Sequence, residues 1–263
     1  MTPLDWLYQA RAKLRIMSGH KEMAAFDMPS QELDPSKGGE LLAVATNDLE
    51  KIFYTHKGRV VHKWIHYPAI YDRFLSVYRN TPVKMLEIGV FKGGSLEMWR
   101  TYLGAQATIF GIDINPDCAE YVDPPNQVRI GSQADPKFLR GVIDEMGAPD
   151  IILDDGSHVA SHQRASFFAL FPLLAEGGLY MIEDLHTSYW RGAFEGGLRR
   201  PGTAIELVKT MIDDMHAWYH GRRQQTAGKT QIGAIHIFDS IVVIEKARRT
   251  EPLQIKVGPA AGP

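Results

Sequence analysis

The sequence predicts an α/β fold built on a mostly parallel sheet, and two patterns carry this prediction. From Val83 onward, short β-branched runs alternate with amphipathic stretches of helix length, as in a parallel sheet with helices on both faces. Near the C-terminus, AIHIFDSIVVIEK contains two apolar runs separated by only Asp239 and Ser240. A link this short suits an antiparallel hairpin and cannot hold a crossover helix. The 263 residues, 44% of them apolar, can also bury a full core.

The strands and helices of the sheet region are expected in alternation. The runs predicted as parallel strands are, in order, VKMLEIGV, ATIFGIDI, QVRIGS, PDIILDD and GGLYMIED. The runs predicted as covering helices are GGSLEMWRTYL, DPKFLRGVIDEM and HQRASFFALFPLL. In a sheet of this kind a ligand lies at the carboxyl ends of the strands, near the point where the strand order reverses. A chemical cluster at such an end is therefore a candidate site.

Three parts are expected along the chain. Residues 1–80 are predicted to form a helical N-terminal cap, residues 81–250 the domain that holds the sheet, and residues 251–263 a flexible tail.

Inside the cap, Thr2 and Pro3 are typical of the start of a helix. The polar, breaker-rich stretch PSQELDPSKGGE, residues 29–40, predicts a loop. In HKWIHYPAIYDRFL, His62 and His66 are expected on one face of a further helix, where a stripe of this kind more often serves packing than function.

Composition excludes several classes of function. Lys plus Arg number 29 and Asp plus Glu 31, a formal net charge of −2, so no broad basic field is present to hold a nucleic acid. The single cysteine, Cys118, rules out an internal disulfide and a thiolate-rich metal site. The N-terminal MTPLDWLYQARAKLRIM has neither the apolar region of a signal peptide nor the length of a membrane span. We therefore expect a cytoplasmic protein with no membrane span.

The stretch LEIGVFKGGS predicts a ligand-binding loop after the first strand. Its glycines let the backbone pass close to a ligand, and the helix that begins there presents free N–H groups. A dinucleotide fold would need a glycine where Phe91 stands, which disfavours NAD. Asp113 ends the following strand, where a carboxylate can accept hydrogen bonds from ribose hydroxyls. The alternative is a generic tight turn beside a solvated aspartate.

Four motifs in this order, LEIGVFKGGSLEMW, GIDI, DDGSH and YMIEDLHTSYW, resemble those of the metal-dependent sugar O-methyltransferases. This family is a branch of the class I S-adenosylmethionine (SAM) methyltransferases. It includes macrolide deoxysugar O-methyltransferases and the methylmannose polysaccharide 1-O-methyltransferase. The resemblance covers roughly residues 55–246. It implies a Rossmann-like fold with a seven-stranded sheet, SAM as cofactor, and a homodimer or larger assembly.

The resemblance also implies which residues bind SAM. The acid and the glycine loop after the first strand would face the methionine part, and Asp113 the ribose. Gln133 and Ala134 would lie by the adenine, although this chain has Ser132 where the family usually shows an aspartate. Asp154, last on its strand, would bind the ammonium group of the methionine part. The residues of the first loop are Glu87, Gly89, Gly93, Gly94 and Ser95.

The remaining acids would hold a metal ion. Asp155 follows the fourth strand, and Glu183 with Asp184 the fifth. Three carboxylates without a soft ligand favour Mg²⁺. A sugar diol can replace two of the waters on the ion, which lowers the pKa of the acceptor hydroxyl and orients its oxygen toward the methyl group.

By the same resemblance, His158 would be the general base. An imidazole with a pKa of about 6.5 can accept the hydroxyl proton near neutral pH, for a typical rate contribution of ~10² to 10⁴. The alternatives for His158 are a helix cap or a metal ligand.

Aromatic residues beyond the fifth strand are candidates for contact with the acceptor. The loop over residues 185–203 is long and polar, and Tyr189 or Trp190 can stack on the apolar face of a sugar ring. His186 would face either the metal or the acceptor. The resemblance suggests that the segment containing Tyr71 closes over SAM, which makes Tyr71 a further candidate.

The expected function is SAM- and Mg²⁺-dependent methylation of a sugar hydroxyl. A mannose-type oligosaccharide is favoured over the deoxysugar of a glycosylated natural product, because the sequence shows no large extra domain and no apolar pocket pattern. A phenol or catechol O-methyltransferase is an alternative, although related families place a lysine as base near the first acid. A non-catalytic SAM-binding protein is another. An iron oxygenase would require two histidines and one carboxylate.

Overall fold

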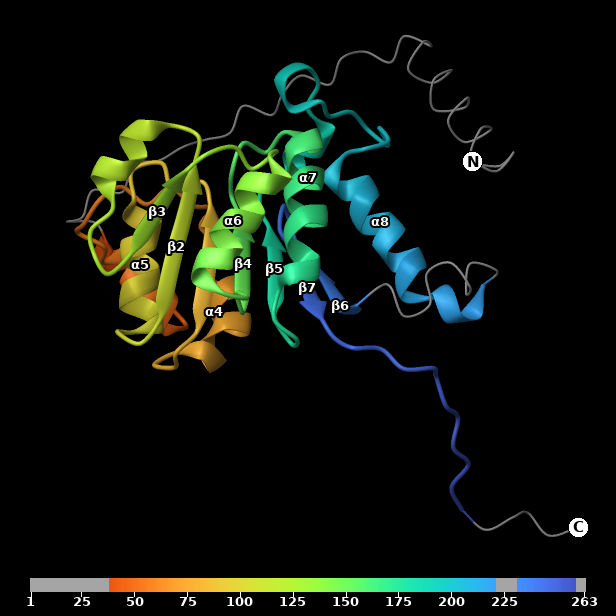
Figure 1. Ribbon diagram of the computed structural model, residues 1–263. Coiled ribbons are helices and arrows are strands. Elements are labelled where there is room, and N and C mark those ends of the chain that lie inside the picture. The colour runs from red at the N-terminus through yellow and green to blue at the C-terminus, as the bar shows by residue number, and fades with distance from the viewer. Residues whose placement is uncertain (1–37, 221–230, 259–263) are drawn as a thin grey trace, which may run out of the picture.

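One seven-stranded sheet forms the centre of the computed structural model, with helices on both faces (Figure 1). The model describes residues 38–220 and 231–258, so the helix expected at Thr2 lies outside the described residues. The strand order is β3-β2-β1-β4-β5-β7-β6. This confirms the predicted α/β fold and its seven strands. The strands are β1 Lys84–Ile88, β2 Thr108–Asp113, β3 Gln127–Ile130, β4 Ile151–Asp154, β5 Leu179–Ile182, β6 Ile232–Ile237 and β7 Val242–Lys246.

The strand order reverses between β1 and β4, and this reversal positions the chemistry. β1 pairs in parallel with β2 on one side and with β4 on the other. β5 continues the sheet in parallel beside β4. The register aligns Ile88 with Asp154 and Asp154 with Ile182. The motifs that follow β1, β4 and β5 therefore meet at one edge of the sheet, as expected at a switch point.

The predicted C-terminal hairpin is confirmed. Its second strand, β7, lies beside β5, and its first strand, β6, forms the edge of the sheet. β7 pairs antiparallel with β5, while β6 pairs antiparallel with β7 at the outer edge. The residues Val242, Val243 and Ile244 are fully buried, because β7 has a strand on each side and core on both faces.

The helices of one face are α6, α7 and α8, which Figure 1 shows side by side in front of the sheet. Asp135 caps α6 by accepting from the backbone N–H groups of Lys137 and Phe138. The helix then buries an apolar stripe at helical spacing against the sheet. The bounds are Pro136–Met146 for α6, Ala160–Leu170 for α7 and Ala204–Met215 for α8.

The opposite face carries α3, α4 and α5, which pack on a second core. Trp99 of α5 and Tyr71 of α4 are fully buried there, with their ring centroids 5.1 Å apart. The bounds are Asp48–Tyr54 for α3, Tyr67–Leu75 for α4 and Gly94–Leu103 for α5.

The cap region corrects two predictions. Helix α2, Gly38–Val44, includes the end of the stretch that was expected to be a loop, whereas residues 29–37 lie outside the described residues. Glu40 in its first turn favours that helix through the dipole of the backbone. Helix α4 begins only at Tyr67, since Pro68 belongs in a first turn, so His62 and His66 precede the helix and share no helical face. Residues 56–66 form neither helix nor strand.

The loop over residues 185–203 contains two short 3₁₀ turns, η4 Leu185–Tyr189 and η5 Gly192–Phe194, before α8 begins. Among the residues that the structure describes, no helix has the length and hydropathy to cross a membrane.

Candidate functional site

Four carboxylates gather at the switch-point edge, and we call them the acidic cluster: Glu87 of β1, Asp155 after β4, and Glu183 with Asp184 after β5. Glu87 and Glu183 are 0% and 1% exposed. Because a buried charge without a partner is very costly, these two carboxylates require partners inside the protein.

Lys63, from the cap region, is one such partner. Its Nζ donates to Asp155 Oδ2 at 2.5 Å and to Glu183 Oε1 at 2.8 Å, and lies 3.7 Å from Glu87 Oε1. The side chain of Lys63 is 2% exposed. Burial alone would lower the pKa of Lys63, but the carboxylates of Asp155, Glu183 and Glu87 outweigh it and raise that pKa well above its usual value. Lys63 is therefore an ammonium that neutralises part of the acidic cluster.

Glu183 is held from a second side by Tyr71, whose hydroxyl donates to Glu183 Oε1. Burial, followed by the nearby charge of Asp155, raises the pKa of Glu183 well above its ordinary range. Tyr71 itself is 0% exposed. Tyr71 was predicted as an acceptor contact, but in the structure it is fully buried and its hydroxyl is hydrogen-bonded to Glu183.

The two carboxylate oxygens of Asp184 contact different parts of the protein: one contacts residues of the cap and the other lies near His158. Its backbone lies in the left-handed region, with φ 54°. Asp184 Oδ1 accepts from Trp64 Nε1 at 3.0 Å and from the hydroxyl of Tyr67 at 2.9 Å. Asp184 Oδ2 lies 3.4 Å from His158 Nε2. Two aromatic donors thus fix this carboxylate, leaving one oxygen directed at the histidine.

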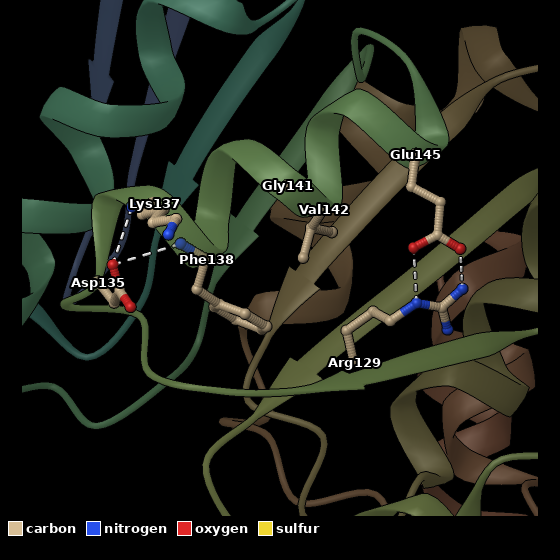
Figure 2. A pocket seen from close by; sticks show the side chains of 7 residues that line it. All are labelled: Arg129, Asp135, Lys137, Phe138, Gly141, Val142 and Glu145. Carbon is tan, nitrogen blue, oxygen red and sulfur yellow. Dashed lines mark hydrogen bonds and ion pairs between the residues drawn. The ribbon is translucent and has the colours of Figure 1, made fainter.

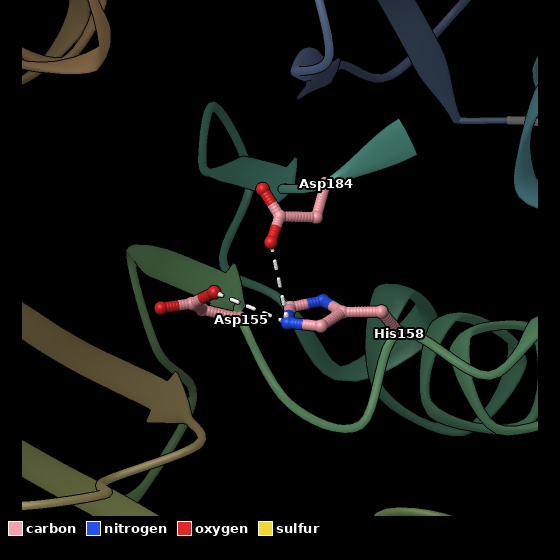
Figure 3. A group of neighbouring side chains, drawn as sticks. All are labelled: Asp155, His158 and Asp184. Carbon is pink, nitrogen blue, oxygen red and sulfur yellow. Dashed lines mark ion pairs between the residues drawn. The ribbon is translucent and has the colours of Figure 1, made fainter. Parts of the chain in front are cut away.

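Asp155, His158 and Asp184 form a compact group (Figure 3). One ligand atom from each lies within 4.8 Å of the others. His158 Nε2 is 3.8 Å from Asp155 Oδ1, and the ring points between the two carboxylates, as Figure 3 shows. The backbone of His158 has φ 55°, an uncommon conformation for a side chain of this size that is often found at functional sites. His158 Nδ1 is buried and has no hydrogen-bond partner.

The donor chemistry of this group fits a divalent cation. Asp155 Oδ1 and Asp184 Oδ2 are hard oxygens that converge with the imidazole of His158. The predicted ligand set was Asp155, Glu183 and Asp184, and the structure brings all three into the acidic cluster. However, Glu183 is not part of the convergent group, because Lys63 and Tyr71 hold its Oε1.

Glu87 is surrounded by donors at the start of the glycine loop. Its carboxylate accepts from the hydroxyl of Ser95 at 2.8 Å and from Trp99 Nε1 at 3.2 Å. Burial raises the pKa of Glu87 despite the nearby charge of Lys63. Ser95, predicted to face SAM, is thus bound to Glu87 within the protein.

The glycines of the first loop allow close approach between segments. At Gly89, which has φ 93°, a Cβ would lie 2.1 Å from the carbonyl oxygen of Asp155. At Gly94, a Cβ would lie 2.3 Å from the carbonyl oxygens of Arg59 and Val60. Gly93 takes a left-handed conformation and caps α5. The loop therefore packs closely on the backbone of Asp155 at Gly89 and on the backbone of the cap at Gly94.

Asp113 holds the same loop from the neighbouring strand. Its Oδ2 accepts from the backbone N–H groups of Val90 and Phe91, and its Oδ1 from that of Asn115. Burial would raise the pKa of Asp113, but these backbone donors outweigh it, so the pKa is lowered. The carboxylate is ionised and half-buried beside the loop.

Asp154, predicted to bind the SAM ammonium group, is fully enclosed by protein groups. It is 0% exposed, and its carboxylate accepts from Gln133 Nε2 and from the hydroxyls of Ser166 and Tyr180. Burial raises its pKa. The expected contact with the SAM ammonium group therefore finds no support, because Asp154 points into the core rather than to the cluster.

Gln133 connects that buried carboxylate to the motif containing His158. Its Oε1 accepts from the backbone N–H of Ser157 at 2.7 Å, and Gln133 is 7% exposed. Ala134, also predicted beside the adenine, is half-buried in the following turn. These contacts make Gln133 a brace between β4 and the turn that presents His158.

Aromatic rings extend from the acidic cluster into the 185–203 loop. The ring of His186 lies 5.5 Å from that of Trp64 and 4.6 Å from that of Trp190. Trp190 continues to Phe194 at 5.6 Å. Tyr189 is 39% exposed beside them. His186 and Trp190 are thus brought next to the Asp184 side of the site.

An open pocket of about 460 Å³ lies elsewhere, between β3 and α6 (Figure 2). It is lined by the ion pair of Arg129 with Glu145 and by the capped start of α6 at Asp135. Because none of the predicted site residues lines it, this pocket is not our candidate site.

Sequence reasoning assigned no site role to Lys63, Trp64 or Tyr67. The stretch HKWIHY carries no motif that we can connect to DDGSH or IED. These residues stand far from the acids in the sequence, and only the folded cap brings them to Asp155 and Asp184.

Comparison with known proteins finds matches to methyltransferases. Residues 86–185 match a methyltransferase domain family. A rhamnosyl-tetracenomycin C 3′-O-methyltransferase from Streptomyces olivaceus is 35% identical over 78% of this chain and 55% of its own length. Mycinamicin VI 2″-O-methyltransferase from Micromonospora griseorubida is 36% identical over 78% of this chain and 53% of its own. The chain thus spans about half the length of these curated relatives.

Solved structures of a methyltransferase also resemble this chain. MycE methyltransferase of the mycinamycin biosynthetic pathway, in complex with Mg and SAH, superimposes with a TM-score of 0.65 at 34% identity, over 76% of this chain and 54% of that one. A second crystal form gives a TM-score of 0.68 at 29% identity, over 93% of this chain and 70% of the other.

Proposed function

The chain belongs to the same methyltransferase family as these deoxysugar O-methyltransferases, and from that premise we propose that it transfers the methyl group of SAM to a sugar hydroxyl with the help of Mg²⁺. The observation that carries this proposal is the convergence of Asp155, His158 and Asp184 at the switch-point edge of the sheet. Two carboxylates that can bind a hard cation and an imidazole that can accept a proton lie together there, beside the glycine loop.

In this proposal the glycine loop and Asp113 bind SAM, with Glu87 at the methionine end. SAM supplies an electrophilic methyl group, and Mg²⁺ supplies a Lewis acid for the acceptor hydroxyl. Asp155 and Asp184 would hold the ion, and Glu183, whose Oε1 accepts from Lys63 and Tyr71, is the further carboxylate beside them. Glu87 and Glu183 form the buried inner side of the site.

His158 takes the proton of the acceptor hydroxyl. Its Nε2 faces the carboxylates, and Thr187 donates to its carbonyl oxygen at 3.1 Å, which fixes the turn. Gln133 braces the preceding residue, Ser157. Because Nε2 also lies within reach of a bound ion, a ligand role for His158 is the competing assignment.

We expect the deoxysugar of a glycosylated natural product as acceptor, ahead of the mannose-type oligosaccharide that the sequence favoured. The relatives that carry this preference act, by their names, on rhamnosyl tetracenomycin and on mycinamicin VI. His186 and Trp190 offer aromatic faces for the sugar ring. A homo-oligomer and a cytoplasmic setting remain predictions.

The experiment that tests the function is an acceptor screen with labelled SAM. Rhamnosylated and other deoxysugar-bearing aglycones, methylmannose oligosaccharides and catechol are each incubated with Mg²⁺ and with chelator. We expect transfer to a deoxysugar hydroxyl only when Mg²⁺ is present. Turnover that persists in chelator would refute the metal site, and SAM binding without transfer to any acceptor would favour a non-catalytic role.

The His158→Ala variant tests the base. We predict that kcat falls by ~10² to 10⁴, while the affinities for SAM and Mg²⁺, measured by calorimetry, change little. A loss of Mg²⁺ affinity of similar size would instead make His158 a ligand.

A phenol O-methyltransferase is the second candidate, because Lys63 contacts Asp155 and so brings a lysine to the first acid of the site. Against this candidate, it is His158 and not Lys63 whose ring nitrogen lies between Asp155 Oδ1 and Asp184 Oδ2. Catechol methylation that survives in His158→Ala would reverse our preference.

A further inference from the structure

Lys63 stands where a cation bound by both Asp155 and Glu183 would have to stand. The ammonium contacts Asp155 Oδ2 at 2.5 Å and Glu183 Oε1 at 2.8 Å. Mg²⁺ binds carboxylate oxygens at about 2.0–2.1 Å. An ion that bridged these same two oxygens would fall within the volume that the ammonium fills. The two cations therefore cannot share this pair of oxygens.

Charge explains why the position is filled by a side chain. Glu87 and Glu183 are fully buried, and Asp155 adds a third acid within reach of Lys63. Leaving a cluster of buried carboxylates without a counter-charge is strongly destabilising. A lysine supplies one positive charge, whereas a divalent ion supplies two. A divalent ion therefore neutralises more of the negative charge of the acidic cluster than Lys63 does.

The position of Lys63 in the chain makes exchange feasible. It lies in residues 56–66, which form neither helix nor strand, on a long flexible side chain. The neighbouring contact of Trp64 with Asp184 uses Oδ1 and leaves Oδ2 to the metal side. Lys63 therefore belongs to no helix or strand that would have to move with it when it leaves Glu183.

We propose that Lys63 is a built-in counter-cation that occupies Asp155 and Glu183 until a divalent ion displaces it, so that this lysine sets the metal affinity of the site. The inference rests on the proposed function, because it takes the acidic cluster to be the metal site. Glu183 then becomes a ligand only when Lys63 leaves, which accounts for its absence from the convergent group.

Calorimetric titration of Mg²⁺ into the full chain tests the proposal, with wild type, Lys63→Met and Lys63→Arg compared. Methionine removes the charge and keeps much of the length. We expect Lys63→Met to bind Mg²⁺ at least tenfold more tightly than wild type, and Lys63→Arg to bind as weakly as wild type or more so. Lys209→Met, on an exposed lysine of α8, is the matched control and should leave Mg²⁺ affinity unchanged.

Thermal unfolding gives a second readout that does not depend on activity. In chelator, Lys63→Met should melt below wild type, because the buried acids lose their counter-charge, and Mg²⁺ should raise its Tm more than that of wild type. Equal or weaker Mg²⁺ binding by Lys63→Met overturns the inference and leaves the proposed function standing. Failure of every variant to bind Mg²⁺ overturns both.

Discussion

Asp154 and Asp155 are adjacent, yet the structure gives them opposite environments. Asp154 faces α7 and is enclosed by Ser166 and Tyr180, whereas Asp155 faces Lys63 and His158. Successive residues of a strand point to opposite faces of the sheet, so a pair of acids at a strand end divides between two sides. Only one of the two reaches the candidate site.

Asp154→Asn tests this division. All three groups bound to Asp154 are donors, so an amide would direct its own N–H groups at a donor. We predict a loss of about 1–3 kcal/mol in the free energy of unfolding, measured with urea. If Asp154 instead bound the SAM ammonium group, stability would be retained and SAM affinity lost.

Cys118 is predicted to be unreactive in the native protein. It is 2% exposed, and burial, assisted by the charge of Asp113, raises the pKa of its thiol to about 11. At pH 8 only ~0.1% of the thiol is then ionised, and the thiolate is the nucleophile. Mass spectrometry after iodoacetamide treatment should show little alkylation at pH 8 and a steep rise toward pH 11. Rapid alkylation at pH 8 would contradict this.

At the scale of elements, the contact between α5 and the cap determines where Lys63 is held. Gly94 is the first residue of α5, and a Cβ at this position would lie 2.3 Å from the carbonyl oxygens of Arg59 and Val60. The same region is fixed by the ion pair of Arg59 with Glu97 at 2.7 Å. The glycine loop thus has a packing role in addition to any ligand that it binds.

Gly94→Ala should therefore be damaging. Its Cβ would lie 2.3 Å from two carbonyl oxygens, so the cap segment must shift, at a typical cost of about 1–3 kcal/mol. Gly141→Ala is the control, because a Cβ at this position of α6 meets nothing within 4 Å. That variant should be neutral or more stable by roughly 0.5–1 kcal/mol. Equal Tm changes for the two variants would refute the close contact.

At the scale of the whole molecule, β7 joins the parallel part of the sheet to its edge. Ile244 of β7 pairs with Tyr180 of β5 and with Ile235 of β6, and it is 0% exposed. Ile244→Ala should cost about 2–5 kcal/mol in urea unfolding. Ile237→Ala, on the outer strand at 54% exposure, should cost much less. Similar losses would mean that the C-terminal hairpin is not integral to the core.

The fold could be predicted from the sequence because its signals are local. A short β-branched run in the sequence predicts each parallel strand, and the two-residue link at Asp239 and Ser240 is too short for a crossover helix. The start of α4 was mistaken because the helical pattern continues upstream of Pro68, while only the proline marks the true first turn. The division into cap, sheet domain and tail stays a prediction.

The sequence by itself determined the acids, the glycine loop and His158, since motifs at strand ends fall together in any parallel sheet of this order. What only the tertiary structure decided is which side chains share those acids. Lys63, Trp64 and Tyr67 reach Asp155 and Asp184 across more than ninety positions of the chain. Local periodicity does not encode such contacts, because they form only when the cap packs on the sheet and brings a cation and hydrogen-bond donors to these carboxylates.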